Sequence, residues 1–309
     1  MILCLGTTPT VQRSMVFERV TSNAVNRAVE VLEGASGKSV NVARVLCTLG
    51  RAALATGFVG GDRGRFLLRE LDRAGIPHDF VEVPTPTRLC ITVMDRASGG
   101  HTELVEEAAA VDPPYWDELR AKVQRLLGKA RMLVMSGSLP RNGPVDFYLQ
   151  CCRLAAAASV PVILDAAGPP LKAALAAGPL VVKPNRAELA LTLGRSIDSR
   201  EALLDAIRQL VQQGPRWAVV TMGAEGAVAG DGREAWYVAV PKVKAVNPIG
   251  SGDAFTAALA AALDDGQSMP EALSLAGACG AANALTPMSG VVHREDVQRL
   301  LGEVRVQRM

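Results

Sequence analysis

The sequence has no long apolar run, and this absence argues against a membrane protein. The N-terminus offers only Ile2 to Leu5 before Gly6, which is too short for a signal peptide. No stretch approaches the ~20 apolar residues that a membrane-spanning helix needs. We therefore expect a cytoplasmic protein without a membrane partner.

Cysteine and histidine are scarce and lack the spacing of ligand sets. The six cysteines have no paired metal-site spacing, and Cys151 and Cys152 are adjacent, so we interpret all six as buried thiols of a reducing compartment. The three histidines, His78, His101 and His293, are scattered along the chain. Neither a metal site built on these residues nor a Ser-His-Asp hydrolase is indicated.

Charge of one sign is also missing. The 33 basic and 31 acidic residues are interspersed and sum to +2, so no charged field marks a nucleic-acid partner. The length of 309 residues and the hydrophobic content of 49% are typical of a globular protein with one large core. A local phosphate-binding site is still compatible with this balance of charge.

What the sequence does contain, from Arg51 onward, is an alternation of short apolar strands and amphipathic helices. Polar and glycine residues collect where these strands end. Such strands end at 135, 164, 182 and 220. The pattern predicts an α/β doubly wound domain whose central sheet is mostly parallel and flanked by helices, with one ligand site at the strand ends.

Two segments have a different pattern of polar and apolar residues. Residues 11–32 and 87–106 mix polar residues with partial alternation of apolar ones, which suggests exposed strands. We expect them to pair as a small sheet outside the main core. The whole chain, residues 1–309, is then a single α/β domain.

A small-residue turn before an alanine-rich helix carries the first candidate site. Gly250 and Gly252 let the backbone approach a ligand, and the first N–H groups of the helix would face an anion, with Ser251 between them. Asp253 could orient or deprotonate an attacking hydroxyl in phosphoryl transfer. Alternatively, Asp253 is only an N-terminal cap.

A second turn, Gly34 to Ser39, resembles a phosphate-binding loop, but only two residues separate Gly34 from Gly37, where a Walker A loop needs four. The glycines, the helix start and Lys38 could instead bind a phosphate or a hydroxyl-rich ligand. The alternative is a helix start with a solvated lysine.

Asn185 and Glu188 lie one helical turn apart after an apolar strand. Their oxygens could face the water shell of one Mg²⁺ ion. The alternative is a helix cap followed by an acidic residue in the first turn.

The order of these motifs resembles the ribokinase-like (PfkB) sugar kinases over nearly the whole chain. Within that family the closest resemblance is to the branch of 1-phosphofructokinase, tagatose-6-phosphate kinase and the minor 6-phosphofructokinase. The matching strings are Ser36 to Ala43, Thr87-Arg88, Ser136 to Pro140, Lys183 to Glu188, Met222 to Ala227 and Gly250 to Asp253.

The resemblance implies a role for each matching residue. Asp253 corresponds to the catalytic base, and Gly250, Ser251 and Gly252 to the anion hole. Residues implied near the sugar are Gln12, Gly37, Lys38, Asn41, Arg88 and Ser138, with Lys38 and Arg88 the candidates for a phosphate on the substrate. Residues implied for the nucleotide are Lys183, Asn185, Thr221, Gly223 and Gly226, with Asn185 and Glu188 toward Mg²⁺. The segments 11–32 and 87–106 correspond to a lid, through which two subunits would pair.

One departure concerns the sugar. The branch usually has an Asn-Pro-x-x-Asp string near its N-terminus, whereas this chain reads Thr8-Pro9-Thr10-Val11-Gln12. An amide both donates and accepts where a carboxylate only accepts, so the hydroxyl pattern that is recognised can differ.

The leading hypothesis is an ATP-dependent, Mg²⁺-requiring kinase of a phosphorylated ketohexose. Fructose 1-phosphate is favoured over tagatose 6-phosphate and fructose 6-phosphate. A kinase of an unphosphorylated sugar or nucleoside is the second reading, and a non-catalytic sugar-phosphate binding protein is the third.

Overall fold

The computed structural model describes residues 1–309 and contains a large and a small sheet. The strands from β11 to β5 are parallel, as the sequence predicted, and the three at the other edge are antiparallel. In order across the large sheet the strands are β14 (Arg305–Arg308), β13 (Ala235–Ala239), β12 (Ala227–Gly230), β11 (Trp217–Thr221), β10 (Val181–Val182), β9 (Val162–Asp165), β8 (Met132–Ser136), β1 (Ile2–Gly6), β4 (Ala53–Val59) and β5 (Val81–Glu82).

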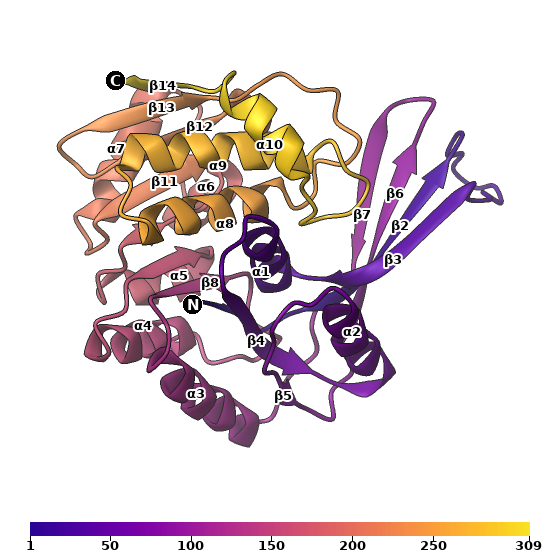
Figure 1. Ribbon diagram of the computed structural model, residues 1–309, viewed down its shortest axis with the longest axis horizontal. Helices are drawn as coiled ribbons and strands as arrows, with labels where there is room; N and C mark the ends of the chain where they lie inside the picture. The colour runs from indigo at the N-terminus through magenta and orange to yellow at the C-terminus, as the bar shows by residue number, and fades with distance from the viewer.

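Helices cover both faces of this sheet and create a core on each (Figure 1). The first core lies under α1 (Lys38–Thr48), α2 (Gly61–Arg73), α8 (Ser251–Asp264), α9 (Met269–Asn283) and α10 (Arg294–Leu301). The second lies under α3 (Pro113–Leu127), α4 (Phe147–Ala157), α5 (Gly168–Leu175), α6 (Arg186–Leu193) and α7 (Arg200–Val211). Cys4 points into the first core and Leu5 into the second. Burial on both faces explains why the central strands are continuous apolar runs.

The small sheet contains β3 (Glu30–Ser36), β2 (Thr10–Phe17), β6 (Arg88–Asp95) and β7 (Gly100–Val105), in that order. It projects from one side of the molecule beside α1 and α2 (Figure 1). Gln12 lies opposite Cys90, and Cys90 opposite Val105. Because side chains directly opposite share a face, these three lie on the same side of the small sheet.

The carboxyl ends of the parallel strands lie at one edge of the large sheet, together with the starts of α1, α6 and α8. Strands β9, β10 and β11 end at Asp165, Val182 and Thr221, and a short 3₁₀ turn, η1 (Gly223–Glu225), follows β11. Open parallel sheets bind ligands at this edge. None of the helices is both long and apolar enough to cross a bilayer.

Candidate active site

A cleft of about 340 Å³ lies between the strand ends of the large sheet and the small sheet. Most of the residues predicted from the sequence line it. These are Gln12, Gly37, Lys38, Asn41, Arg88, Lys183, Asn185, Glu188, Thr221, Gly250, Gly252 and Asp253. The cleft therefore gathers segments that are far apart in the sequence, which is the convergence expected of one shared site.

Asp253 lies in the first turn of α8 and is 6% exposed. Its Oδ2 accepts a hydrogen bond of 2.8 Å from Nδ2 of Asn41 on α1. Gly250, and not Asp253, is the N-cap residue of α8, and Asp253 makes no side-chain cap. The capping alternative is therefore not what the structure contains. The carboxylate faces the cleft instead.

The turn before Asp253 presents two backbone N–H groups without partners. Ser251 and Asp253 donate their N–H groups to Pro248 and Gly250, whereas those of Gly250 and Gly252 make no hydrogen bond in the protein. Gly250 has a φ of 87°, and a Cβ there would lie 2.7 Å from the nitrogen of Gly290. The left-handed conformation and the close approach both require glycine. Unpaired N–H groups at a helix start are suited to an anion.

Burial raises the pKa of Asp253 to about 6. The negative charge of Asp165 adds to the rise, whereas Lys38, Lys183 and the hydrogen bond from Asn41 act against it. A base whose pKa lies near neutral pH accepts a proton readily and is still ionised in the cell.

Asp165 joins the two walls of the cleft, and sequence reasoning did not assign it a role. Its Oδ1 lies 3.1 Å from Nζ of Lys38, and its Oδ2 lies 3.0 Å from Nζ of Lys183. Thr256 on α8 donates to the same Oδ2 at 3.1 Å. The two lysines outweigh the effect of complete burial and hold the pKa of Asp165 below its usual value. The signal in the sequence was its position at the end of β9, directly after the apolar residues Val162 to Leu164.

Asn185 and Glu188 form a capping box at the start of α6. Oδ1 of Asn185 accepts from the N–H of Glu188, and Oε2 of Glu188 accepts from the N–H of Asn185, both at 2.8 Å. The other carboxylate oxygen, Oε1, lies 3.2 Å from Nζ of Lys38. The cap reading is thus correct for Asn185, while Glu188 also presents an oxygen to the cleft.

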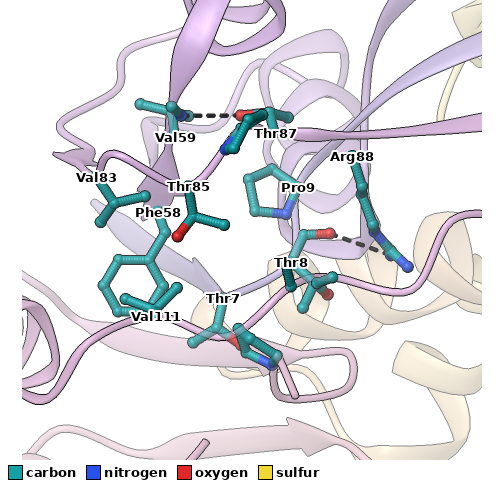
Figure 2. Close-up of a pocket in the computed structure, with 15 residues that line it drawn as sticks. Thr7, Thr8, Pro9, Phe58, Val59, Val83, Thr85, Thr87, Arg88 and Val111 are labelled. Carbon is teal, nitrogen blue, oxygen red and sulfur yellow. Dashed lines mark hydrogen bonds between the residues drawn. The ribbon is translucent and has the colours of Figure 1, made fainter. Parts of the chain in front are cut away.

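Arg88 lies at the opposite end of the cleft, on β6. Its guanidinium donates to the carbonyl oxygen of Thr8 at 3.1 Å (Figure 2) and to that of Glu106 at 3.3 Å. Behind it lies a separate cavity of about 30 Å³, lined in part by Thr7, Phe58 and Val83. That space holds about one water and is too small for a sugar or a nucleotide.

Gln12 lies on β2, the strand next to β6, opposite Cys90, and is 2% exposed. Its Nε2 donates to Oγ1 of Thr92 at 2.7 Å. The amide oxygen remains to accept a hydrogen bond in the cleft, as a carboxylate at this position would.

Four predicted residues do not line the cleft: Ser251, Ser138, Gly223 and Gly226. The carbonyl of Ser138 accepts from the hydroxyl groups of Thr7 and Thr8 and so ties the end of β8 to that of β1. A Cβ at Gly226 would lie 1.9 Å from the carbonyl oxygen of Val238. Gly226 is therefore needed for the close pairing of β12 with β13.

Residues 1–291 match the family described as pfkB family carbohydrate kinase. Phosphofructokinase-2 from Escherichia coli in complex with fructose-6-phosphate is 28% identical, with a TM-score of 0.89 over 98% of each chain.

Two further solved structures share the fold. A "possible 1-phosphofructokinase" from Thermotoga maritima is 23% identical, with a TM-score of 0.92 over 100% of this chain and 99% of that one. A ribokinase from Arabidopsis thaliana, complexed with ribose and ATP, is 20% identical, with a TM-score of 0.77 over 97% and 98%. The ribokinase-like fold and the branch predicted from the motifs are confirmed. The chain belongs to the pfkB family of carbohydrate kinases.

Proposed function

We propose that this sugar kinase uses ATP and Mg²⁺ to phosphorylate a hydroxyl of a phosphorylated ketohexose, with Asp253 as the base. The observation that carries the proposal is the juxtaposition of a buried carboxylate with two unpaired N–H groups at the start of α8. A base and an anion hole side by side are the parts that phosphoryl transfer needs.

In the proposed step, the acceptor hydroxyl gives its proton to Asp253 while its oxygen forms a bond to the γ-phosphorus of ATP. The bond from that phosphorus to the bridging oxygen breaks, and ADP leaves with the bond's electron pair. Gly250 and Gly252 would donate their N–H groups to the charge on the transferred group. Lys183, Thr221 and Asn185 line the same wall and are the proposed contacts of the nucleotide.

The acceptor phosphate is assigned to Arg88 in this proposal. Lys38, the other candidate from the sequence, is ion-paired with Asp165 and Glu188 and is better suited to the transferred phosphoryl group. Support for a phosphorylated acceptor also comes from the similarity to a phosphofructokinase that binds fructose-6-phosphate. Fructose 1-phosphate remains the acceptor that the sequence favours, and Gln12 and Asn41 are the proposed partners of its hydroxyls.

Glu188 suits the Mg²⁺ ion that the family implies, because the capping box holds the side chain in place and leaves Oε1 toward the cleft. One carboxylate together with waters and substrate phosphates is a usual Mg²⁺ environment, and Asn185 would act through water. When bound, the ion would neutralise charge on the phosphates of ATP.

The small sheet is proposed to be a lid that also pairs two subunits. It meets the body through His101, whose Nε2 lies 2.5 Å from the carbonyl oxygen of Val246, and through Ser14, which donates to Pro287 at 3.3 Å. A closed lid would keep water away from the transferred group. The six free cysteines fit the cytoplasmic location expected from the sequence.

The test is ADP release measured with Mg²⁺-ATP against a panel of sugar phosphates, free sugars and nucleosides. We expect turnover with ketohexose phosphates, and in Asp253→Asn a loss of most turnover with ATP binding retained. The control is Asp265→Asn at the other end of α8, where Asp265 pairs with Arg51 on the surface. Turnover of unphosphorylated acceptors alone would refute the assigned substrate class. Tight binding of sugar phosphates without ADP release would indicate the non-catalytic reading.

A further inference from the structure

Arg44 lies on α1, one helical turn after Asn41, and does not line the cleft. Its guanidinium is nevertheless tied to the site. Nη1 donates to Oδ1 of Asn41 and to the carbonyl oxygen of Ser289, both at 3.2 Å, and Nη2 donates to the carbonyl oxygen of Ala35. The arginine therefore fastens together α1, β3 and the loop between α9 and α10.

The donor chemistry of arginine determines which way the Asn41 amide faces. A guanidinium has five N–H donors and no acceptor, so the amide atom that it contacts must be the oxygen. The hydroxyl of Ser36 adds a second contact to the same oxygen at 3.1 Å. With Oδ1 held on this side, Nδ2 is the atom that faces Asp253.

We infer that Arg44 is a positioning residue for phosphoryl transfer: it holds the Asn41 amide so that its N–H group, and not its oxygen, meets Asp253. This rests on the role proposed for Asp253 above. The ionised carboxylate itself attracts the N–H group, but after it takes the proton it can also donate to an oxygen. Arg44 keeps the amide in the same orientation in both states, so the base returns to its ionised form for the next turnover.

The orientation has a consequence for protonation. Burial and the charge of Asp165 raise the pKa of Asp253, whereas Lys38, Lys183 and the hydrogen bond from Asn41 lower it. Without Arg44 only the Ser36 hydroxyl contacts the amide oxygen, and because a hydroxyl can also accept a hydrogen bond, it does not fix the orientation of the amide. The hydrogen bond from Asn41 to Asp253 is then weakened. The pKa of Asp253 then rises. Because the base must be ionised to accept a proton, the acid limb of the pH–activity profile moves to higher pH.

The experiment compares Arg44→Met, Arg44→Lys and Asn41→Ala with the double variant Asn41→Ala/Arg44→Met, in the turnover assay across pH. We expect Arg44→Met to lower kcat by tenfold or more, up to about a hundredfold for a misplaced reacting geometry. The acid limb of kcat/KM should move to higher pH, and the KM for ATP should change little. Arg44→Lys keeps a donor and should recover part of the rate.

The double variant separates positioning from general structural damage. If Arg44 acts through Asn41, replacing it in the Asn41→Ala background should cost almost nothing more. Arg51→Met is the matched control, because Arg51 pairs with Asp265 on the surface. Melting temperatures are measured for all variants, and Arg44→Lys replaces Arg44→Met in the cycle if the latter does not fold.

Additive losses in the double variant, or an unmoved acid limb with a near-normal rate, would overturn the inference. Its failure is distinguishable from failure of the proposed function. If the unmodified enzyme turns over and Asp253→Asn does not, while the Arg44 variants behave like the control, only the positioning role is wrong.

Discussion

Two aspartates in the cleft lie in opposite environments although both are buried. Asp253 has one hydrogen bond to its carboxylate, and burial raises its pKa to about 6. For Asp165, burial also opposes ionisation, but the charges of Lys183 and Lys38 prevail and its pKa is lowered. Ionised Asp253 therefore destabilises the folded state, whereas ionised Asp165 stabilises it.

Asp253→Asn should raise the stability of the ligand-free protein at pH 8. An acid whose pKa is raised on folding contributes stability below its unfolded pKa, and that contribution is lost as pH rises through about 6. The rise in the pKa of Asp253 on folding corresponds to a loss of about 3 kcal/mol of folding stability at high pH. Chemical denaturation at pH 4 and pH 8 checks this, with a gain expected only at pH 8. Asp165→Asn should destabilise at pH 8, and equal effects of both substitutions would contradict the assignment.

Asp253 and Lys38 were candidates from the sequence because they lie in short motifs with recognisable turn chemistry, and Asn41 was a candidate through the family resemblance alone. Asp165 could not be predicted, because its partner Lys38 is 127 positions away. The contacts of Arg44 with Asn41 and Ala35 are local, but only the folded loop at Ser289, 245 positions away, completes the set. A sequence read alone shows which residues can carry chemistry. It does not show which of them hold one another in place.

At the scale of elements, two helices begin with the same motif but only one faces the cleft. Asn185 and Glu188 cap α6, and Ser268 and Glu271 cap α9, where Glu271 accepts from the N–H of Ser268 at 2.8 Å. Glu271 lies on the surface, while Glu188 also contacts Lys38. The pair provides a natural comparison for the role proposed for Glu188.

Glu188→Gln should raise the Mg²⁺ concentration needed for half-maximal turnover several-fold, with little change in melting temperature. Glutamine also forms capping boxes, so the start of α6 is preserved while the negative charge is removed. Glu271→Gln should change neither quantity. Magnesium titrations of the three proteins check this. An unchanged Mg²⁺ requirement in Glu188→Gln would remove this residue from the proposed metal site.

The strand ends predicted at 135, 164, 182 and 220 lie within one residue of the observed ends of β8, β9, β10 and β11. Strand β14 was not predicted, because a short edge strand rich in arginine has no apolar pattern.

At the scale of the whole molecule, one face of the small sheet carries exposed apolar side chains. Val31 and Leu104 are each 53% exposed. The strand register places them on one face with Met15, Ile91 and Val93. The same face also carries Thr102 and the ion pair of Arg13 with Glu33, and its apolar part supports the subunit pairing proposed above.

Val31→Lys combined with Leu104→Lys should shift the protein from dimer to monomer in sedimentation experiments. Two lysines on each copy of the face would have to be buried without partners. Leu191→Lys is the control, since Leu191 is 75% exposed but lies on α6, away from the small sheet. A dimer that survives the double substitution would exclude this face, and a monomeric unmodified protein would exclude the pairing.

The position of β1 also affects how the chain reaches its native state. This strand lies between β4, which begins at Ala53, and β8, which begins only at Met132. Local pairings form sooner, so β1 can join β4 through α1 while its other edge waits for β8. During that interval an apolar strand edge is open to the same edge of another molecule. Docking of β8 is therefore expected to protect the growing or refolding chain from aggregation. The fraction of chains that aggregate should rise with the concentration of partly folded chains in which β8 has not yet docked.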